Sequence, residues 1–175
     1  MNDIMNRLQQ FDSIFHRIGN DWMLISASDG ERINTMTASW GCCGVLWNKP
    51  IAVCFIRPQR YTFPIMEGAT HFSLAFFDGE EREALRYCGR QSGRDGDKFA
   101  GAGLTCLQTE DGVPYPKEAK RVLICRKLYA DWLKEDCFID SALLSNYEAK
   151  DYHKIYVGEI VACIGEQDEA PGLTK

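Results

Sequence analysis

The chain has 175 residues, of which 45% are apolar, enough to build one domain with a hydrophobic core and too many for intrinsic disorder. Its net charge is −5, with dispersed lysines and arginines, a balance that argues against a nucleic-acid partner. No run approaches the roughly 20 apolar residues of a membrane span, and residues 1–15 lack the apolar run of a signal peptide. We therefore expect a cytoplasmic protein with no membrane partner.

Apolar periodicity predicts strands separated by short helices. In chain order the expected elements are strand 21–27, strand 32–40, strand 51–56, helix 62–67, strand 71–77, helix 80–88, loop 89–96, helix 97–102, strand 121–132, helix 140–147 and strand 155–164. Asp29-Gly30 is typical of a hairpin turn, and Thr62 and Asp140 are suited to helix N-caps. Three regions are expected: an N-terminal extension 1–20, one domain 21–165 and a loose tail 166–175.

Six or more strands with only short helices between them predict a mainly β protein, a closed or nearly closed antiparallel barrel. A doubly wound α/β fold would need a longer helix after nearly every strand. The sequence also has no G-x-G-x-x-G after its first strand and no Walker loop. A nucleotide would therefore have to bind by another route.

Eight cysteines occur without C-x-x-C spacing, and none is paired with a histidine at zinc-finger intervals. Several lie in apolar strands, where a reduced thiol behaves as a small buried side chain. The adjacent Cys42 and Cys43 lie in a segment with candidate function, so a redox or metal role there stays open.

Two segments carry polar groups suited to a ligand. Residues 34–40 (NTMTASW) place Thr37 and Ser39 on one face of an extended strand, next to Trp40, before glycines release the chain. They could line a ligand, and an ordinary edge strand is equally consistent. Residues 57–62 (RPQRYT) combine two guanidiniums, a phenol and a hydroxyl at a helix start, which favours a phosphate site over a solvated loop.

Two further segments are weaker on their own. Residues 92–99 (SGRDGDKF) bring Arg94 and Lys98 from a loop into a helix, where they could give a phosphate a second cationic contact. His153 follows Tyr152 at the start of the last strand and could stack on or hydrogen-bond a ligand ring, although a lone histidine is more often structural.

The ordered set NTMTASW, WNKP, RPQRYT, SGRDGDKF, AGLT and DYHKIYVGEI resembles the flavin reductase-like family, especially its flavoredoxin-like branch, over residues 22–164. The resemblance implies an FMN-binding split β-barrel of antiparallel Greek-key type that forms a homodimer, with FMN near the interface. It also implies three sets of cofactor-binding residues. The flavin wall comprises Asn34, Thr37, Ala38, Ser39 and Trp40. The phosphate turn comprises Arg57, Arg60, Tyr61 and Thr62, and segment 92–99 contributes Ser92 and Lys98. His153 matches a histidine near the flavin or nicotinamide. Cys42 and Cys43 depart from the glycine-rich segment that the resemblance leads us to expect at these positions.

The implied function is an FMN-dependent NAD(P)H:acceptor oxidoreductase that passes electrons to a flavin, a small molecule, or a redox-protein or oxygenase acceptor. No metal is expected. One alternative is an electron-carrier flavoprotein without its own nicotinamide site. A third reading is a flavin or heme store, or a metal protein that uses Cys42 and Cys43.

Overall fold

The computed structural model describes residues 14–165, so the expected tail 166–175 and residues 1–13 of the expected extension lie outside it. Its elements are α2 (Ile14–His16), η1 (Arg17–Asp21), β1 (Met23–Ser28), β2 (Ile33–Ala38), β3 (Gly41–Leu46), β4 (Lys49–Ile56), α3 (Thr62–Gly68), β5 (His71–Phe76), α4 (Arg82–Arg90), α5 (Lys98–Gly101), β6 (Cys106–Gln108), β7 (Pro114–Pro116), β8 (Arg121–Trp132), η2 (Glu135–Cys137), η3 (Ser141–Tyr147) and β9 (Lys154–Gly165). No helix in this part of the chain is long and apolar enough to cross a membrane.

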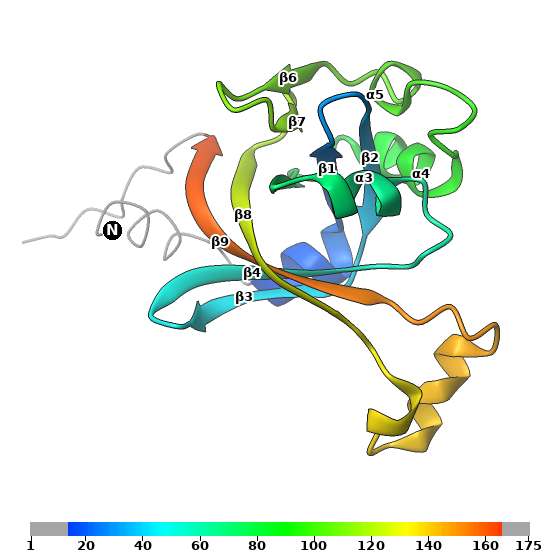
Figure 1. Cartoon of the computed structure of the whole chain (residues 1–175). Helices are drawn as coiled ribbons and strands as arrows, with labels where there is room; N and C mark the ends of the chain where they lie inside the picture. Colours follow the sequence, from blue (N-terminus) through cyan, green and yellow to red (C-terminus); the bar gives the residue numbers. More distant parts are fainter. Residues whose placement is uncertain (1–13, 166–175) are drawn as a thin grey trace, which may run out of the picture.

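Seven strands form one curved sheet in the order β2-β1-β5-β8-β9-β4-β3, and every neighbouring pair is antiparallel. β8 and β9 are its longest strands and curve through the whole molecule (Figure 1). Between them, residues 133–153 carry η2 and η3 and project from the end of the sheet; we call this segment the lobe. The expected mainly β, antiparallel architecture is confirmed.

Three strands are buried on both faces, which gives the molecule two hydrophobic clusters. Along β1, Met23 and Ile25 face one cluster while Leu24 between them faces the other, because successive side chains of a strand point to opposite sides. β5 and β8 alternate in the same way. The second cluster is covered by Leu85 of α4 and Phe99 of α5. The short helices thus close the outer face of β1, β5 and β8.

The hairpin of β3 and β4 corrects one expectation. Strand 32–40 was expected to continue to Trp40 before glycines released the chain, but β2 ends at Ala38 and Gly41 starts a new strand. A Cβ at position 41 would lie 2.8 Å from the carbonyl oxygen of Val53, so glycine allows this close pairing. The turn to β4 uses positive φ at Trp47 (53°) and Asn48 (55°), as two-residue hairpins do.

A second correction concerns the start of α3. Thr62 was expected to cap this helix, but Tyr61 occupies the cap position without a side-chain cap hydrogen bond, and Thr62 is already in the first turn. The cap at Asp140 is confirmed, because its carboxylate accepts from the Ala142 amide. The sequence did not predict the turns α2 and η1, nor η2 or the small β6–β7 hairpin.

Candidate flavin site

An open pocket of about 230 Å³ lies where β2 ends, beside the end of β4 and the start of β9. Its lining contains seven of the residues singled out from the sequence: Thr37, Ala38, Ser39, Trp40, Arg57, Arg60 and His153. Met36 and Phe55 complete it and were not predicted. The pocket therefore joins segments 34–40, 57–62 and 151–154, which are far apart in the sequence.

The other predicted residues lie beneath or beside this lining. Asn34 and Thr62 are buried, and the Asn34 amide donates to the Thr62 hydroxyl over 2.9 Å. Tyr61 and Ser92 are half-buried, and a Cβ at the neighbouring Gly93 would lie 2.5 Å from the Tyr61 ring. These residues pack segments 34–40, 57–62 and 92–99 together behind the pocket. Thr37 is also engaged, because its hydroxyl donates to a carbonyl of α4.

Two neighbouring cations, Arg60 in the pocket lining and Lys98 close to it, have no carboxylate partner in the described part of the chain. Lys98 is only 4% exposed, and its ammonium makes no hydrogen bond or ion pair with any residue of 14–165. Arg60 donates only to the carbonyl of Gly89, over 3.1 Å. Burial, opposed by the nearby Cys88 and reinforced by Arg60, lowers the pKa of Lys98 to about 8; burial also lowers the pKa of Arg60. Buried charges without partners are costly, so this pair favours binding of an anion.

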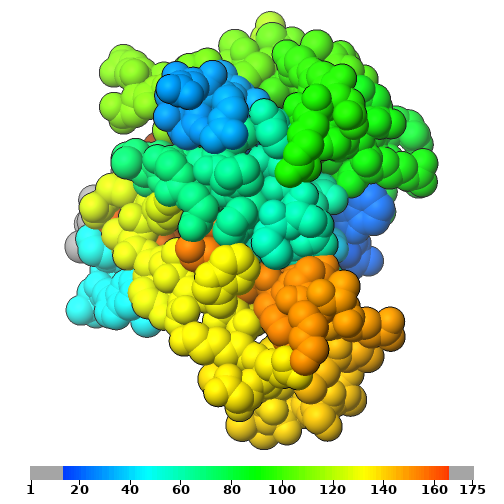
Figure 2. All heavy atoms as spheres, turned by 45° about the vertical axis from the view of Figure 1, so that its right-hand side comes forward, coloured from blue at the N-terminus to red at the C-terminus, as the bar shows by residue number. Residues whose placement is uncertain are grey.

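Arg57, by contrast, is already paired. Its guanidinium donates to the carboxylate of Asp151 and, over 2.9 Å, to the carbonyl of Asn146, and it lies 5.1 Å over the Tyr147 ring. Gln59 donates to the same oxygen of Asp151. Arg57 thus lines the pocket as the link between the turn after β4 and the lobe. In Figure 2 the lobe, in orange, lies directly below the α3 region, in teal.

His153 lies among aromatic rings in the lining of the pocket. Its ring centroid is 5.2 Å from that of Trp40 and 6.4 Å from that of Phe55. The hydroxyl of Tyr147 is 2.9 Å from Nδ1, which leaves Nε2 as the ring nitrogen without a partner among residues 14–165. Burial first, and then the charge of Arg57, lower the pKa of His153 to about 4. The imidazole is therefore neutral at physiological pH.

Tyr147 and Trp22 are site residues that sequence reasoning missed. Tyr147 gives no local signal, since its contact with His153 forms only when the lobe folds back. Trp22 lines a second pocket of about 290 Å³, which shares Thr37, Ala38, Ser39 and Arg60 with the first. The sequence placed Trp22 inside the predicted strand 21–27, whereas β1 starts at Met23 and the Trp22 backbone has a φ of 70°.

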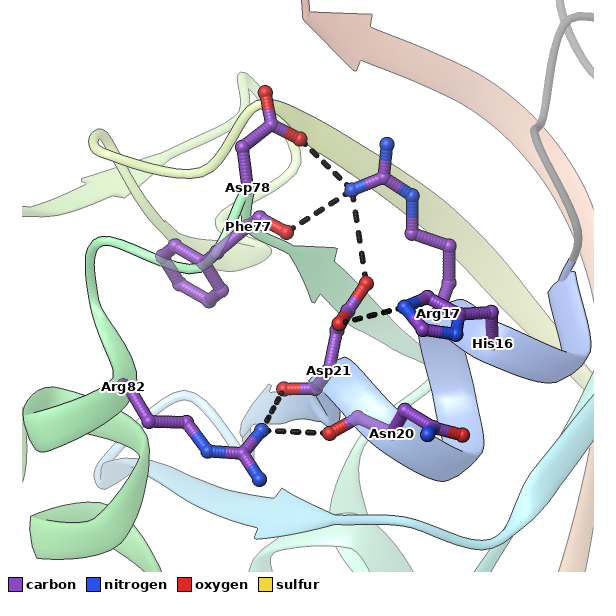
Figure 3. Close-up of polar contacts among 7 residues, drawn as sticks. All are labelled: His16, Arg17, Asn20, Asp21, Phe77, Asp78 and Arg82. Carbon is purple, nitrogen blue, oxygen red and sulfur yellow. Dashed lines mark hydrogen bonds and ion pairs between the residues drawn. The ribbon is translucent and has the colours of Figure 1, made fainter.

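The segment before Trp22 is held by the polar contacts drawn in Figure 3. Arg82 of α4 stacks 3.6 Å from the centroid of the Trp22 ring and donates to the carbonyls of Asn20 (2.7 Å) and Asp21 (2.9 Å). Arg17 donates to the Phe77 carbonyl and pairs with Asp78 over 2.8 Å. These bonds fix the strained Trp22 backbone against α4 and β5.

Cys42 and Cys43 are neighbours in the regular strand β3, where successive side chains point to opposite faces. Cys42 is exposed, and both thiols are unpaired. Burial, together with the neighbouring Cys42, raises the pKa of Cys43 to about 12, which makes this thiol a poor nucleophile. Within residues 14–165, no group of three or more His, Cys, Asp or Glu side chains could hold a metal ion.

The structure is a curved antiparallel barrel whose pocket is lined by aromatic rings and two arginines. The sequence profile of the flavin reductase like domain matches residues 15–174. The chain belongs to the flavin reductase-like family. No curated protein matches the chain.

Solved structures confirm the split-barrel fold. An FMN-binding protein from Thermus thermophilus with bound p-hydroxybenzaldehyde is 22% identical, over 90% of this chain and 78% of that one, with a TM-score of 0.66. Flavoredoxin from Methanosarcina acetivorans is 24% identical over 84% and 69%, with a TM-score of 0.65. A split-barrel flavin reductase from Shewanella frigidimarina is 17% identical over 93% and 79%, with a TM-score of 0.68.

Proposed function

We propose that the chain is an FMN-dependent NAD(P)H:acceptor oxidoreductase, with the flavin held in the pocket that Trp40, Arg60 and His153 line. Bound FMN would supply the redox chemistry, which is hydride transfer from a nicotinamide donor and electron transfer to a flavin, a protein or a small-molecule acceptor. The eight unpaired thiols are suited to a reducing compartment, so we place the protein in the cytoplasm.

The observation that carries the proposal is the buried, partnerless ammonium of Lys98 close to Arg60. A single phosphate group would compensate the charges of both Lys98 and Arg60. The aromatic rings of Trp40 and Phe55 line the same pocket as Arg60, and they would desolvate an apolar ring system. The residues present therefore fit a phosphorylated flavin.

The side chains of the site have distinct roles in this proposal. Arg60 and Lys98 bind the phosphate. Trp40 and Phe55 exclude water from the flavin ring, and the neutral His153 offers Nε2 to the flavin or the nicotinamide. Arg57, which the sequence assigned to the phosphate turn, instead holds the lobe through Asp151.

We also propose a homodimer with FMN near its interface, because the edge strand β3 and the turn after it expose apolar side chains. Val45 is 66% exposed and Trp47 is 55% exposed, and both follow closely on Trp40 of the pocket. An apolar edge strand of this kind is normally covered by a partner. Replacing Val45 by Asp should convert a dimer into a monomer in light scattering, whereas a monomeric parent would refute the proposal.

An absorption spectrum of the purified protein, before and after anaerobic addition of NADH or NADPH, tests the function. Flavin bands that bleach support the oxidoreductase. Bands that persist with both donors but vanish with dithionite support the electron carrier without a nicotinamide site. A colourless protein that takes up no added FMN contradicts the proposal.

Arg60→Ala tests the phosphate contact. The loss of one charge-assisted hydrogen bond should cost about 1.5–3 kcal/mol, roughly ten- to a hundredfold in FMN affinity. Riboflavin, which has no phosphate, should bind the variant and the parent alike. An equal loss for both ligands would show instead that the variant damages the fold.

A further inference from the structure

The exposed side of α4 carries a groove of about 360 Å³ that the proposed flavin site does not use. Its lining includes Glu83, Arg86, Tyr87, Arg90 and Gln91, and it reaches Gly101 of α5. We call it the α4 groove. It is larger than the flavin pocket, whose volume is about 230 Å³.

The α4 groove connects to the flavin pocket through the pocket that Trp22 lines. That intermediate pocket shares Arg86 and Arg90 with the α4 groove, and it shares Arg60 and the end of β2 with the flavin pocket. A ligand longer than a mononucleotide could therefore extend from the flavin pocket across α4. The Thr37 hydroxyl and the Arg60 guanidinium both bond to carbonyls of α4, so they fix this helix relative to the flavin pocket.

The junction carries two guanidiniums. Arg86 and Arg90 are four residues apart, so they lie on one face of the helix. Arg86 pairs with Glu83, but Arg90 makes no hydrogen bond, ion pair or ring contact with any residue of 14–165. Guanidiniums match the geometry of phosphate oxygens, which suits this junction to a pyrophosphate.

The far end of the groove offers a fixed aromatic ring. Tyr87 packs so closely on Gly101 that a Cβ at position 101 would lie 2.1 Å from the tyrosine Oη. The absence of a side chain at Gly101 thus makes room for the phenol ring. Tyr87 can stack on a base, and the carboxylate of Glu83 and the amide of Gln91 can accept or donate hydrogen bonds to a ribose or a base.

We infer that the α4 groove binds the adenosine diphosphate portion of a dinucleotide whose other portion lies in the flavin pocket. Arg86 and Arg90 bind the phosphate on the adenosine side, next to the phosphate site of Arg60, and Tyr87 stacks on the adenine. The inference rests on the proposed function and deepens it. Two dinucleotides share this chemistry, FAD and NAD(P)H.

The test is a titration of parent and Arg90→Gln protein with FMN, FAD and ADP-ribose, together with the KM for NADH and NADPH. Lys117→Gln, which removes one positive charge from an exposed site elsewhere, is the matched control. Arg90→Gln should weaken ADP-ribose binding about tenfold and leave FMN affinity within about twofold. A parallel loss for FAD identifies the flavin as the dinucleotide, and a parallel rise in KM identifies the nicotinamide donor.

Gly101→Ala provides an independent variant, since it displaces Tyr87 without removing charge. It should also weaken ADP-ribose binding and spare FMN. The inference is overturned if the parent binds FMN but not ADP-ribose, or if Arg90→Gln and Lys117→Gln behave alike. A parent that binds no flavin refutes the proposed function, while ADP-ribose binding that is lost in Arg90→Gln would still support the groove.

Discussion

The hydroxyl of Tyr147 lies 2.9 Å from Nδ1 of His153, so a residue of the lobe engages one nitrogen of the only histidine in the pocket's described lining. Burial raises the pKa of Tyr147, which keeps its phenol protonated and able to donate. When the phenol donates to Nδ1, the ring proton of the neutral imidazole lies on Nε2. The pocket is then offered a hydrogen-bond donor rather than an acceptor.

Tyr147→Phe should therefore lower the turnover number for NAD(P)H oxidation about three- to tenfold, the value of one neutral hydrogen bond, with little change in FMN affinity. ¹⁵N NMR of His153 should show the Nε2–H form in the parent and a mixture of tautomers in the variant. Tyr152→Phe, which alters the ring stacked on Tyr147, is the control and should change neither quantity. A parent with its proton on Nδ1 would contradict the assignment.

The low pKa of His153 predicts a loss of stability in acid. Because the folded-state pKa of about 4 lies below the unfolded value near 6.5, the unfolded chain binds the proton more tightly. The contribution is complete above pH 6.5 and is lost as the pH falls toward 4. Urea denaturation should show the parent losing about 1–2 kcal/mol more than His153→Gln over this range, a value discounted for the partial solvation of the ring. Parallel curves for the two proteins would refute the prediction.

Lys98→Met should reduce FMN affinity about ten- to a hundredfold and leave riboflavin affinity unchanged. Since the pKa of Lys98 is about 8, the parent should also lose FMN affinity as the pH rises from 7.5 to 9.5, because the deprotonated amine no longer attracts the phosphate. Fluorescence titrations of the variant should be flat over this range. A variant that follows the parent's pH profile would place the phosphate elsewhere.

Gly158→Ala should destabilise the fold by about 1–3 kcal/mol, because a Cβ there would lie 2.8 Å from Cys125 Cβ and from the Phe72 ring, both fully buried. Gly44→Ala is the matched control, a strand glycine with nothing within 4 Å of its added Cβ. It should change the free energy of unfolding by less than about 0.5 kcal/mol. Equal effects of the two substitutions in thermal denaturation would contradict the packing described for β9.

The strands were predictable where their composition is regular. The predicted strand 121–132 matches β8 in both bounds, and its apolar run 122–125 is typical of a buried strand. β3 was missed because Gly41, Cys42, Cys43 and Gly44 carry no strand pattern, and their pairing depends on β4 across the turn. The lobe turn η2 and the strands β6 and β7 have three residues each, which is too short for a periodic apolar pattern to be detected.

The sequence indicated which segments form the pocket, but it did not indicate which side chains in it pair with one another. Segments 34–40, 57–62 and 151–154 meet as the motifs suggested. The pairing of Arg57 with Asp151, however, joins residues 94 positions apart, and no local pattern can show it. The same holds for Lys98: only the folded structure shows that this buried lysine has no carboxylate partner within residues 14–165.

The lobe has a mechanical consequence for the pocket. Tyr147, Asp151 and His153 all belong to this one excursion, whose two ends are joined by the bond from the Leu133 amide to the His153 carbonyl. His153 is therefore carried at the tip of the β8–β9 ribbon, and the ion pair of Arg57 with Asp151 ties the lobe to the turn after β4. Any tilt of the lobe moves the imidazole with it, so a change at the surface of the lobe alters the distances across the pocket.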